Sequence, residues 1–216
     1  MILAVRGDLP VKLYFAADTC SLSPHIVLQE LSLPYELVRV NNRTKRTSEG
    51  SDFLSINPKG YVAALMLDDG QVLTEGPAIL QYLADLRPEC GLAPENGSLE
   101  RVRLQEWLNF ITAEVHAGSS PLFDRSLPMA VQEAVKAKLF RRLDIVEARL
   151  ADARHLMGDR FTVADAYLFT VLGWMRFFSI GLDRWPSISG YIRRIGDRPS
   201  VSAAYVREQE IAPVAE

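Results

Sequence analysis

A cysteine near the start of the chain, Cys20, has the position of a reactive thiol. It follows an apolar, β-branched and aromatic segment and precedes Ser23-Pro24, a pair typical of a helix start. Free N–H groups and the positive end of a helix stabilise a thiolate, so this position predicts a lowered thiol pKa. Serine stands where a dithiol oxidoreductase has its resolving cysteine, so Cys20 can hold or exchange a thiol but cannot close its own disulfide. The alternative is a cysteine packed in the core.

A second predicted helix start carries an acidic residue. Glu75 precedes Gly76-Pro77, and the N–H groups of Gly76 and Ala78 can bind a carboxylate with help from the helix dipole. The Glu75 carboxylate can pair with an ammonium group. A ligand with both an α-amine and an α-carboxylate would satisfy both groups. The alternative is that Glu75 only favours the helix end electrostatically.

A polar stripe is predicted on a later helix. Its members follow the spacing i, i+3, i+4, i+7 and therefore share one face: Asn109, Thr112, Ala113 and His116. This face either lines a cleft or is simply solvated. The three histidines of the chain show no metal-ligand spacing, so no metal site is predicted.

Composition excludes several classes of partner. The 216 residues carry 24 basic and 27 acidic side chains, which are scattered and give a net charge of -3. No basic stripe suits nucleic acid, and no polybasic tail suits a membrane. The most apolar stretch, residues 161–182, is interrupted by Asp165 and Arg176, which argues against a transmembrane helix. Two cysteines without a Cys-x-x-Cys pair suit a reducing cytosol, so a cytoplasmic location is expected.

The elements that position Cys20 and Glu75 follow from hydrophobic periodicity. The expected order is βαβαββα, an α/β unit. Strands are predicted at 11–16, 35–40, 64–67 and 72–74, and helices at 24–32, 52–56 and 76–86. Asp68-Asp69-Gly70 predicts the hairpin turn between the last two strands.

The second half of the chain has helical patterns only. Residues 91–98 are rich in Pro, Gly and Asn and predict a linker, and residues 99–216 predict an all-α helical bundle domain. The stretch 161–178 is apolar nearly all round, so it is expected at the centre of the bundle. Thr162 and Asp165 form a capping-box variant at its start. We expect Asp165→Ala to cost about 1 kcal/mol or more.

A set of short motifs across both halves resembles the glutathione S-transferase family, most closely its bacterial beta class. The motifs are Thr19-Cys20-Ser21-Leu22, Asn57-Pro58-Lys59-Gly60, Leu73-Thr74-Glu75-Gly76, Ala78-Ile79-Leu80-Gln81-Tyr82-Leu83-Ala84-Asp85, Glu106-Trp107-Leu108-Asn109 and Phe161-Thr162-Val163-Ala164-Asp165-Ala166. The resemblance runs from residue 11 to the end, and residues 1–10 are interpreted as an N-terminal extension.

The resemblance implies a thioredoxin-like glutathione-binding domain at 11–90, a helical domain at 99–216 and a homodimer. It implies that Cys20 contacts the glutathione sulfur and that Glu75 and Gly76 receive the γ-glutamyl end. It further implies that backbone atoms of Val62 bind the cysteinyl part and that Lys45 meets a peptide carboxylate. Two residues match positions that approach glutathione from the helical domain: Asn109 and His116, the latter with Cys20 as a catalytic residue.

Three positions depart from the family pattern. Ala63 stands where the family has a cis-proline, and a cis bond before a non-proline residue costs about 3–4 kcal/mol. A trans Val62–Ala63 bond or a local rearrangement is therefore predicted, with weakened glutathione affinity. Asp18 places a negative charge near Cys20, which opposes thiolate formation. Ala117 removes a cation that the beta class usually carries as lysine.

Three functions follow, in order of preference. The first is a glutathione transferase that conjugates glutathione, its substrate, to an electrophilic and partly apolar cosubstrate, as in detoxification. The second is a glutathione-dependent thiol/disulfide reductase that works through a Cys20 mixed disulfide. The third is a non-catalytic glutathione- or ligand-binding protein, for which Ala63 and Asp18 argue.

Overall fold

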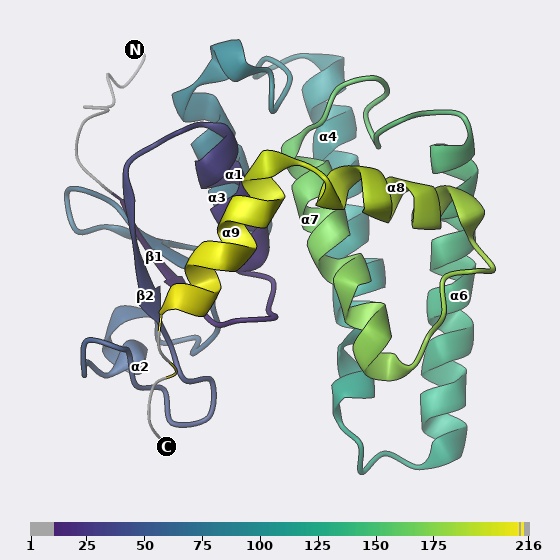
Figure 1. Cartoon of the computed structure of the whole chain (residues 1–216), viewed down its shortest axis with the longest axis horizontal. Helices are drawn as coiled ribbons and strands as arrows, with labels where there is room; N and C mark the ends of the chain where they lie inside the picture. The colour runs from purple at the N-terminus through teal and green to yellow at the C-terminus, as the bar shows by residue number, and fades with distance from the viewer. Residues whose placement is uncertain (1–10, 212, 214–216) are drawn as a thin grey trace. The chain divides into compact units, whose positions relative to one another are not determined.

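The computed structural model of the protein describes residues 11–211 and 213, and they divide into two compact units (Figure 1). The first unit comprises Met1–Cys90 together with Arg198–Glu216, and the second comprises Gly91–Asp197. The extension expected at residues 1–10 lies outside the described residues. Within the described part of the chain, no helix combines the length and the apolar character needed to cross a membrane.

The first unit confirms the βαβαββα order. Its elements are β1 (Val11–Phe15), α1 (Leu22–Glu30), β2 (Tyr35–Arg39), α2 (Phe53–Ile56), β3 (Ala64–Met66), β4 (Val72–Thr74), α3 (Gly76–Leu86), a 3₁₀ turn (Pro88–Cys90) and α9 (Pro199–Glu210). The strands form one mixed sheet in the order β2-β1-β3-β4. β1 pairs parallel with β2, and β3 pairs antiparallel with both β1 and β4.

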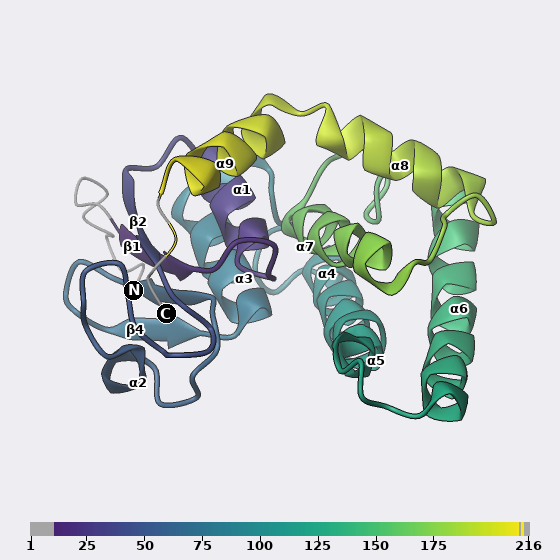
Figure 2. The same cartoon turned by 60° about the horizontal axis from the view of Figure 1, so that its bottom comes forward.

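Both faces of this sheet are covered. Tyr14 of β1 packs on one face with Val38 and Ala64 of the neighbouring strands, and Phe53 of α2 joins this cluster. Because side chains alternate along a strand, Leu13 and Phe15 point to the opposite face. Helices α1 and α3 cover that face (Figure 2). This double coverage explains why β1 is apolar at three consecutive positions.

Helix α1 begins earlier than the sequence predicts. Its N-cap is Ser21 rather than Ser23. The buried Ser21 hydroxyl accepts a hydrogen bond from the Ala16 N–H at 3.2 Å, which ties the helix start to the end of β1. Ser23 lies inside the first turn and donates to the Cys20 carbonyl at 2.8 Å. The helix therefore begins two residues after Cys20, and Pro24 occupies its third position rather than its first.

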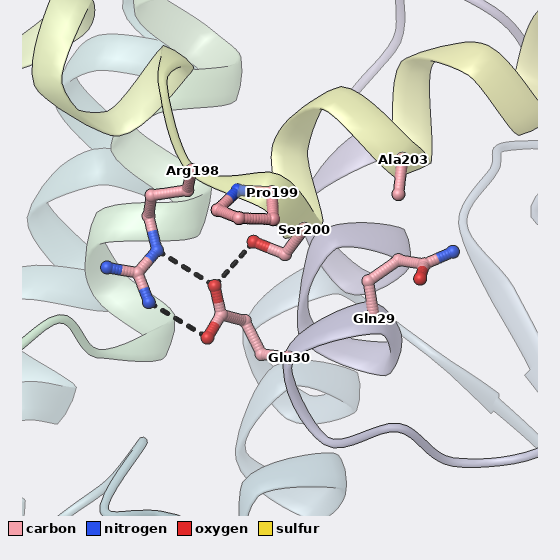
Figure 3. Close-up of a pocket in the computed structure, with 6 residues that line it drawn as sticks. All are labelled: Gln29, Glu30, Arg198, Pro199, Ser200 and Ala203. Atoms are coloured by element: carbon pink, nitrogen blue, oxygen red, sulfur yellow. Dashed lines mark hydrogen bonds and ion pairs between the residues drawn. The ribbon is translucent and has the colours of Figure 1, made fainter.

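Helix α9 packs against α1 through buried and half-buried polar contacts (Figure 3). Arg198 donates from Nε and Nη2 to the two Glu30 carboxylate oxygens at 2.8 and 2.9 Å, and the Ser200 hydroxyl also bonds to Glu30. Further along, His25 Nδ1 lies 3.0 Å from Glu208 Oε1, with both side chains buried. A cavity of about 330 Å³ adjoins the Glu30 contact and is lined by Gln29, Glu30, Arg198, Pro199, Ser200 and Ala203.

These contacts join α9 to the first unit, whereas its residues are predicted from the sequence to belong to the helical domain. The domain limits drawn from the sequence stay a prediction.

The second unit is all-helical, as predicted. It contains α4 (Leu99–Phe110), a π-helix (Ile111–His116), α5 (Ala117–Ser119), a 3₁₀ turn (Ser120–Phe123), α6 (Met129–Ala151), α7 (Val163–Leu172), a 3₁₀ segment (Gly173–Phe178) and α8 (Pro186–Gly196). All ten residues of α7 are buried. Helix α7 packs on α4 and α8, and α8 packs on α6 (Figures 1 and 2).

The capping box at the start of α7 is present and carries more contacts than its sequence pattern predicts. The fully buried Asp165 accepts from the Thr162 N–H at 2.8 Å and from the Thr162 hydroxyl at 2.9 Å. It also accepts from the Leu156 N–H at 2.9 Å and the Tyr191 hydroxyl at 3.1 Å. Asp165 thus joins the helix start to a loop and to α8.

Candidate functional site

Cys20 lies in the connection between β1 and α1, half-buried and not in a disulfide. Its thiol donates to the Val62 carbonyl oxygen at a distance of 3.2 Å. Val62 lies two residues before the start of β3, which is the neighbour of β1 in the sheet. The sheet order therefore brings together a sulfur and a backbone segment that are 42 residues apart.

The pKa of Cys20 is raised to about 11, mainly by burial. The prediction of a lowered pKa is therefore wrong. Hydrogen bonds from the backbone N–H groups of Cys20 and Ala63 act in the predicted direction, but burial outweighs them. The negative charge of the Glu75 carboxylate raises the Cys20 pKa further. The sequence predicts this effect from Asp18 instead. At neutral pH Cys20 is a protonated thiol that can donate a hydrogen bond.

The Val62–Ala63 peptide bond is cis, and this corrects the expectation of a trans bond. The expectation rested on the energy of an isolated peptide, whereas both residues are buried here and lead directly into β3. The Asn57 side chain donates to the Tyr61 carbonyl at 2.7 Å, which ties the preceding residues to the end of α2. The surrounding tertiary contacts thus decide the geometry at this position.

Glu75 is the N-cap residue of α3 and has a φ of 72°, a backbone conformation that residues other than glycine seldom adopt. Its side chain is exposed and accepts from Lys59 Nζ at 2.6 Å, and Lys59 also donates to the Thr74 hydroxyl at 3.0 Å. The Ala78 N–H donates to the Glu75 carbonyl at 3.0 Å. The prediction that Ala78 offers its N–H to a ligand is therefore wrong, because the first turn of the helix already uses it.

Lys45 belongs to the same unit and is held near the Val62 segment. Its Nζ donates to the Gly60 carbonyl at 2.7 Å and lies 5.6 Å from the centre of the Tyr61 ring. Lys45 itself has a φ of 56°. The loop after β2 thus brings a cation to the residues that precede Val62.

Asn109 and His116 lie in the second unit, on α4 and on the π-helix that follows it. The wider turn of a π-helix changes the register of the predicted polar face. Asn109 is exposed and donates to the Gln105 carbonyl at 2.9 Å. His116 Nδ1 instead lies 2.7 Å from the Tyr167 hydroxyl oxygen. The His116 ring packs edge-on against Trp174, with 4.7 Å between the ring centres. Burial lowers the His116 pKa, so the ring is neutral at pH 7.

Two partners of these residues were missed by the sequence analysis. The pattern around Lys59 predicts only a turn. The available signal is that a lysine in a turn before a hairpin can reach the end of the second hairpin strand, where Lys59 contacts Thr74 and Glu75. Tyr167 lies on a helix that is apolar nearly all round, and its hydroxyl was the available signal, because a buried tyrosine usually has a hydrogen-bond partner. Among the residues that the structure describes, no group of three or more His, Cys, Asp or Glu side chains could hold a metal ion.

Comparison with known families separates the chain into the same two parts. Residues 19–86 match the model of the glutathione S-transferase N-terminal domain, and residues 129–194 match that of the C-terminal domain. The chain belongs to the glutathione S-transferase family. A curated relative, glutathione S-transferase GstA of Escherichia coli O157:H7, is 42% identical over 92% of this transferase and 98% of its own length.

Solved structures agree with this membership and with the beta-class resemblance. A sphingomonad glutathione S-transferase complexed with glutathione has a TM-score of 0.89 at 40% identity, covering 92% of this chain and 98% of that one. A bacterial beta-class glutathione S-transferase of Sphingomonas chungbukensis has a TM-score of 0.89 at 40% identity, covering 93% and 100%. The thioredoxin-like unit and the helical unit are thus those of a glutathione S-transferase.

Proposed function

We propose that this transferase conjugates glutathione to an electrophilic, partly apolar cosubstrate and that Cys20 assists the glutathione sulfur without becoming the nucleophile. The observation that carries this proposal is the hydrogen bond from the Cys20 thiol to the Val62 carbonyl, 3.2 Å long, made by a thiol whose pKa burial raises to about 11. A protonated thiol at this position is a hydrogen-bond donor that a bound thiolate can accept from.

The reaction assigns each group a simple role. Glutathione loses its thiol proton to solvent, the Cys20 S–H turns away from the Val62 carbonyl, and the resulting thiolate accepts the hydrogen bond from Cys20. The thiolate then forms a carbon–sulfur bond with the electrophile, whose leaving group departs with the bonding electron pair. Cys20 stays reduced throughout, since it only donates a hydrogen bond. Fixing the nucleophile beside a donor favours the reaction through position and charge stabilisation.

The remaining glutathione contacts are proposed for residues around Cys20 in the first unit. Glu75 takes the α-ammonium of the γ-glutamyl group, Gly76 donates its N–H to the α-carboxylate, and Val62 offers backbone atoms to the cysteinyl part. Lys45, near Gly60 and Tyr61, is proposed for the terminal carboxylate. Asn109 and His116 of the second unit are proposed as further contacts on the strength of family membership alone.

A homodimer is part of the same proposal. Two apolar side chains of α4, Leu99 and Val102, are three residues apart and are 65% and 54% exposed, which supports a surface that another copy covers. A cytoplasmic site of action is proposed because Cys20 and Cys90 are both free thiols. Conjugation of electrophiles gives the protein a role in detoxification.

The experiment compares the wild type with Cys20→Ser, and uses Cys90→Ser as the matched control because Cys90 is the other, exposed cysteine. Three quantities are measured: conjugation of a halonitroarene, reduction of a glutathionylated disulfide, and glutathione binding by calorimetry. We expect Cys20→Ser to keep binding and most conjugation, because serine is also a hydrogen-bond donor, and Cys90→Ser to match the wild type.

Other outcomes would support the other functions. Disulfide reduction that disappears in Cys20→Ser, with little conjugation in the wild type, would identify a reductase with Cys20 as its nucleophile. Binding without either activity would identify a glutathione-binding protein. Absence of glutathione binding in the wild type would overturn the proposal altogether.

A further inference from the structure

The start of α3 offers a ligand carboxylate unusually few backbone donors. A helix N-terminus ordinarily has several N–H groups without partners inside the helix. In α3, Pro77 has no N–H, and the N–H groups of Ala78 and Ile79 both donate to the Glu75 carbonyl at 3.0 Å. Among residues 76–79 this leaves the Gly76 N–H for a ligand. A carboxylate with two oxygens requires a further donor.

Lys59 is the cation placed next to this helix start. Its Nζ lies 2.6 Å from Glu75 Oε1 and 3.0 Å from Thr74 Oγ1, so it lies beside the two residues that precede Gly76. The turn that carries Lys59 is fixed by its own hydrogen bonds. The Lys59 N–H donates to Asn57 Oδ1 at 3.1 Å, and the Gly60 N–H donates to the Asn57 carbonyl at 2.9 Å.

We propose that Lys59 is a further glutathione-binding residue, which binds the α-carboxylate of the γ-glutamyl group together with the Gly76 N–H while Glu75 binds the α-ammonium. This inference rests on the proposed function and extends it by one residue. The Lys59–Glu75 ion pair then has the same two charges as the amino-acid end of the ligand. On binding, Lys59 exchanges the Glu75 carboxylate for the α-carboxylate of the ligand. Glu75 exchanges the Lys59 ammonium for the α-ammonium of the ligand.

Physical properties of the pair suit this exchange. The side chains of Lys59 and Glu75 are 55% and 64% exposed, so opening their ion pair costs little. An ammonium on a flexible stem has three donors, and therefore Lys59 can keep its contact with Thr74 while it turns to a carboxylate. The amino-acid end of the ligand carries one ammonium and one carboxylate, as the Lys59–Glu75 pair does. Binding of this end therefore adds no net charge to the first unit.

The test separates the two charges of the ligand. Binding of glutathione, glutaryl-Cys-Gly and 4-aminobutyryl-Cys-Gly is measured by calorimetry at low salt. The second peptide keeps the carboxylate and lacks the amine, and the third keeps the amine and lacks the carboxylate. The variants are Lys59→Met and Lys59→Arg, with Lys138→Met as the control. Lys138 is matched because it also forms an exposed ion pair, with Glu114 at 3.7 Å.

We expect Lys59→Met to weaken the binding of glutathione and of glutaryl-Cys-Gly by about five- to tenfold. This is the range for one charge-assisted hydrogen bond at a partly exposed position. Binding of 4-aminobutyryl-Cys-Gly should stay within about twofold or become tighter. Lys59→Arg and Lys138→Met should resemble the wild type.

An equal loss of affinity for all three ligands in Lys59→Met would overturn the inference, because Lys59 would then only orient Glu75. Tighter glutathione binding in Lys59→Met would also overturn it, since Lys59 would then be a competitor for Glu75. A wild type that binds none of the ligands would instead defeat the proposed function.

Discussion

Replacement of Asp165 by alanine is expected to destabilise the second unit by about 3 kcal/mol. The change removes an acceptor for four donors: the N–H groups of Leu156 and Thr162 and the hydroxyls of Thr162 and Tyr191. The two hydroxyls can rotate toward other acceptors, and Tyr191 already donates to the Asp165 carbonyl at 3.1 Å. The two backbone N–H groups are fixed in a buried environment and lose their partner.

The magnitude follows from these two groups. Each buried donor left without a partner costs about 1–3 kcal/mol, so the pair costs about 2–6 kcal/mol. Burial of the carboxylate works in the opposite direction, as the raised pKa of Asp165 indicates, and its removal recovers part of this cost. The net value of about 3 kcal/mol is a large share of the 5–15 kcal/mol that stabilises a typical domain. It exceeds the lower bound of about 1 kcal/mol expected from the capping pattern alone.

The assay is urea unfolding followed by far-UV circular dichroism and tryptophan fluorescence at one fixed protein concentration. Tyr191→Phe is the matched control, because it removes one of the same donors while the N–H groups of Leu156 and Thr162 keep their acceptor, and it should cost about 1 kcal/mol. Asp165→Asn keeps one acceptor oxygen, so its loss of unfolding free energy should lie between those of Asp165→Ala and Tyr191→Phe. A loss for Asp165→Ala no larger than that for Tyr191→Phe would refute the reasoning.

Three further predictions concern ionisable groups. Alkylation of Cys20 in a Cys90→Ser background should accelerate toward pH 11 rather than level off near 8.5, since burial raises its pKa to about 11; a plateau below pH 9 would contradict the structure. Burial opposes the ionisation of Glu30, but hydrogen bonds from Arg198 and Ser200 outweigh it and lower the Glu30 pKa. Glu30 therefore contributes stability that is present above its unfolded pKa of about 4.3 and is lost as pH falls through the lower folded value. Glu30→Gln should cost about 1 kcal/mol at pH 7 and progressively less below pH 4, as read from urea midpoints; a pH-independent cost would argue against the ion pair. Because burial lowers the His116 pKa below 6.5, the conjugation rate of wild type and His116→Gln should show the same pH dependence between pH 7 and 8; an inflection in that range present only in the wild type would show that His116 titrates there.

Local patterns in the sequence account for most of the fold. Strand β1 follows from its β-branched and aromatic residues, and the β3–β4 hairpin follows from the turn residues Asp68-Asp69-Gly70. Both are properties of a few adjacent residues. The capping box of Thr162 and Asp165 was equally visible, because both partners lie within one helical turn. Cys20 and Glu75 could be selected for the same reason, since each lies at the start of a helix.

The sequence by itself thus determined the order of the elements, the two-part division of structure types and the residues at the helix ends. Only the tertiary structure decided the ionisation of Cys20, because burial beside Val62 outweighs the local helix-end effect. It also decided the Lys59–Glu75 and Glu30–Arg198 pairs, whose members are 16 and 168 residues apart. Hydration and charge pairing depend on neighbours that folding brings together, and those neighbours are not adjacent in the chain.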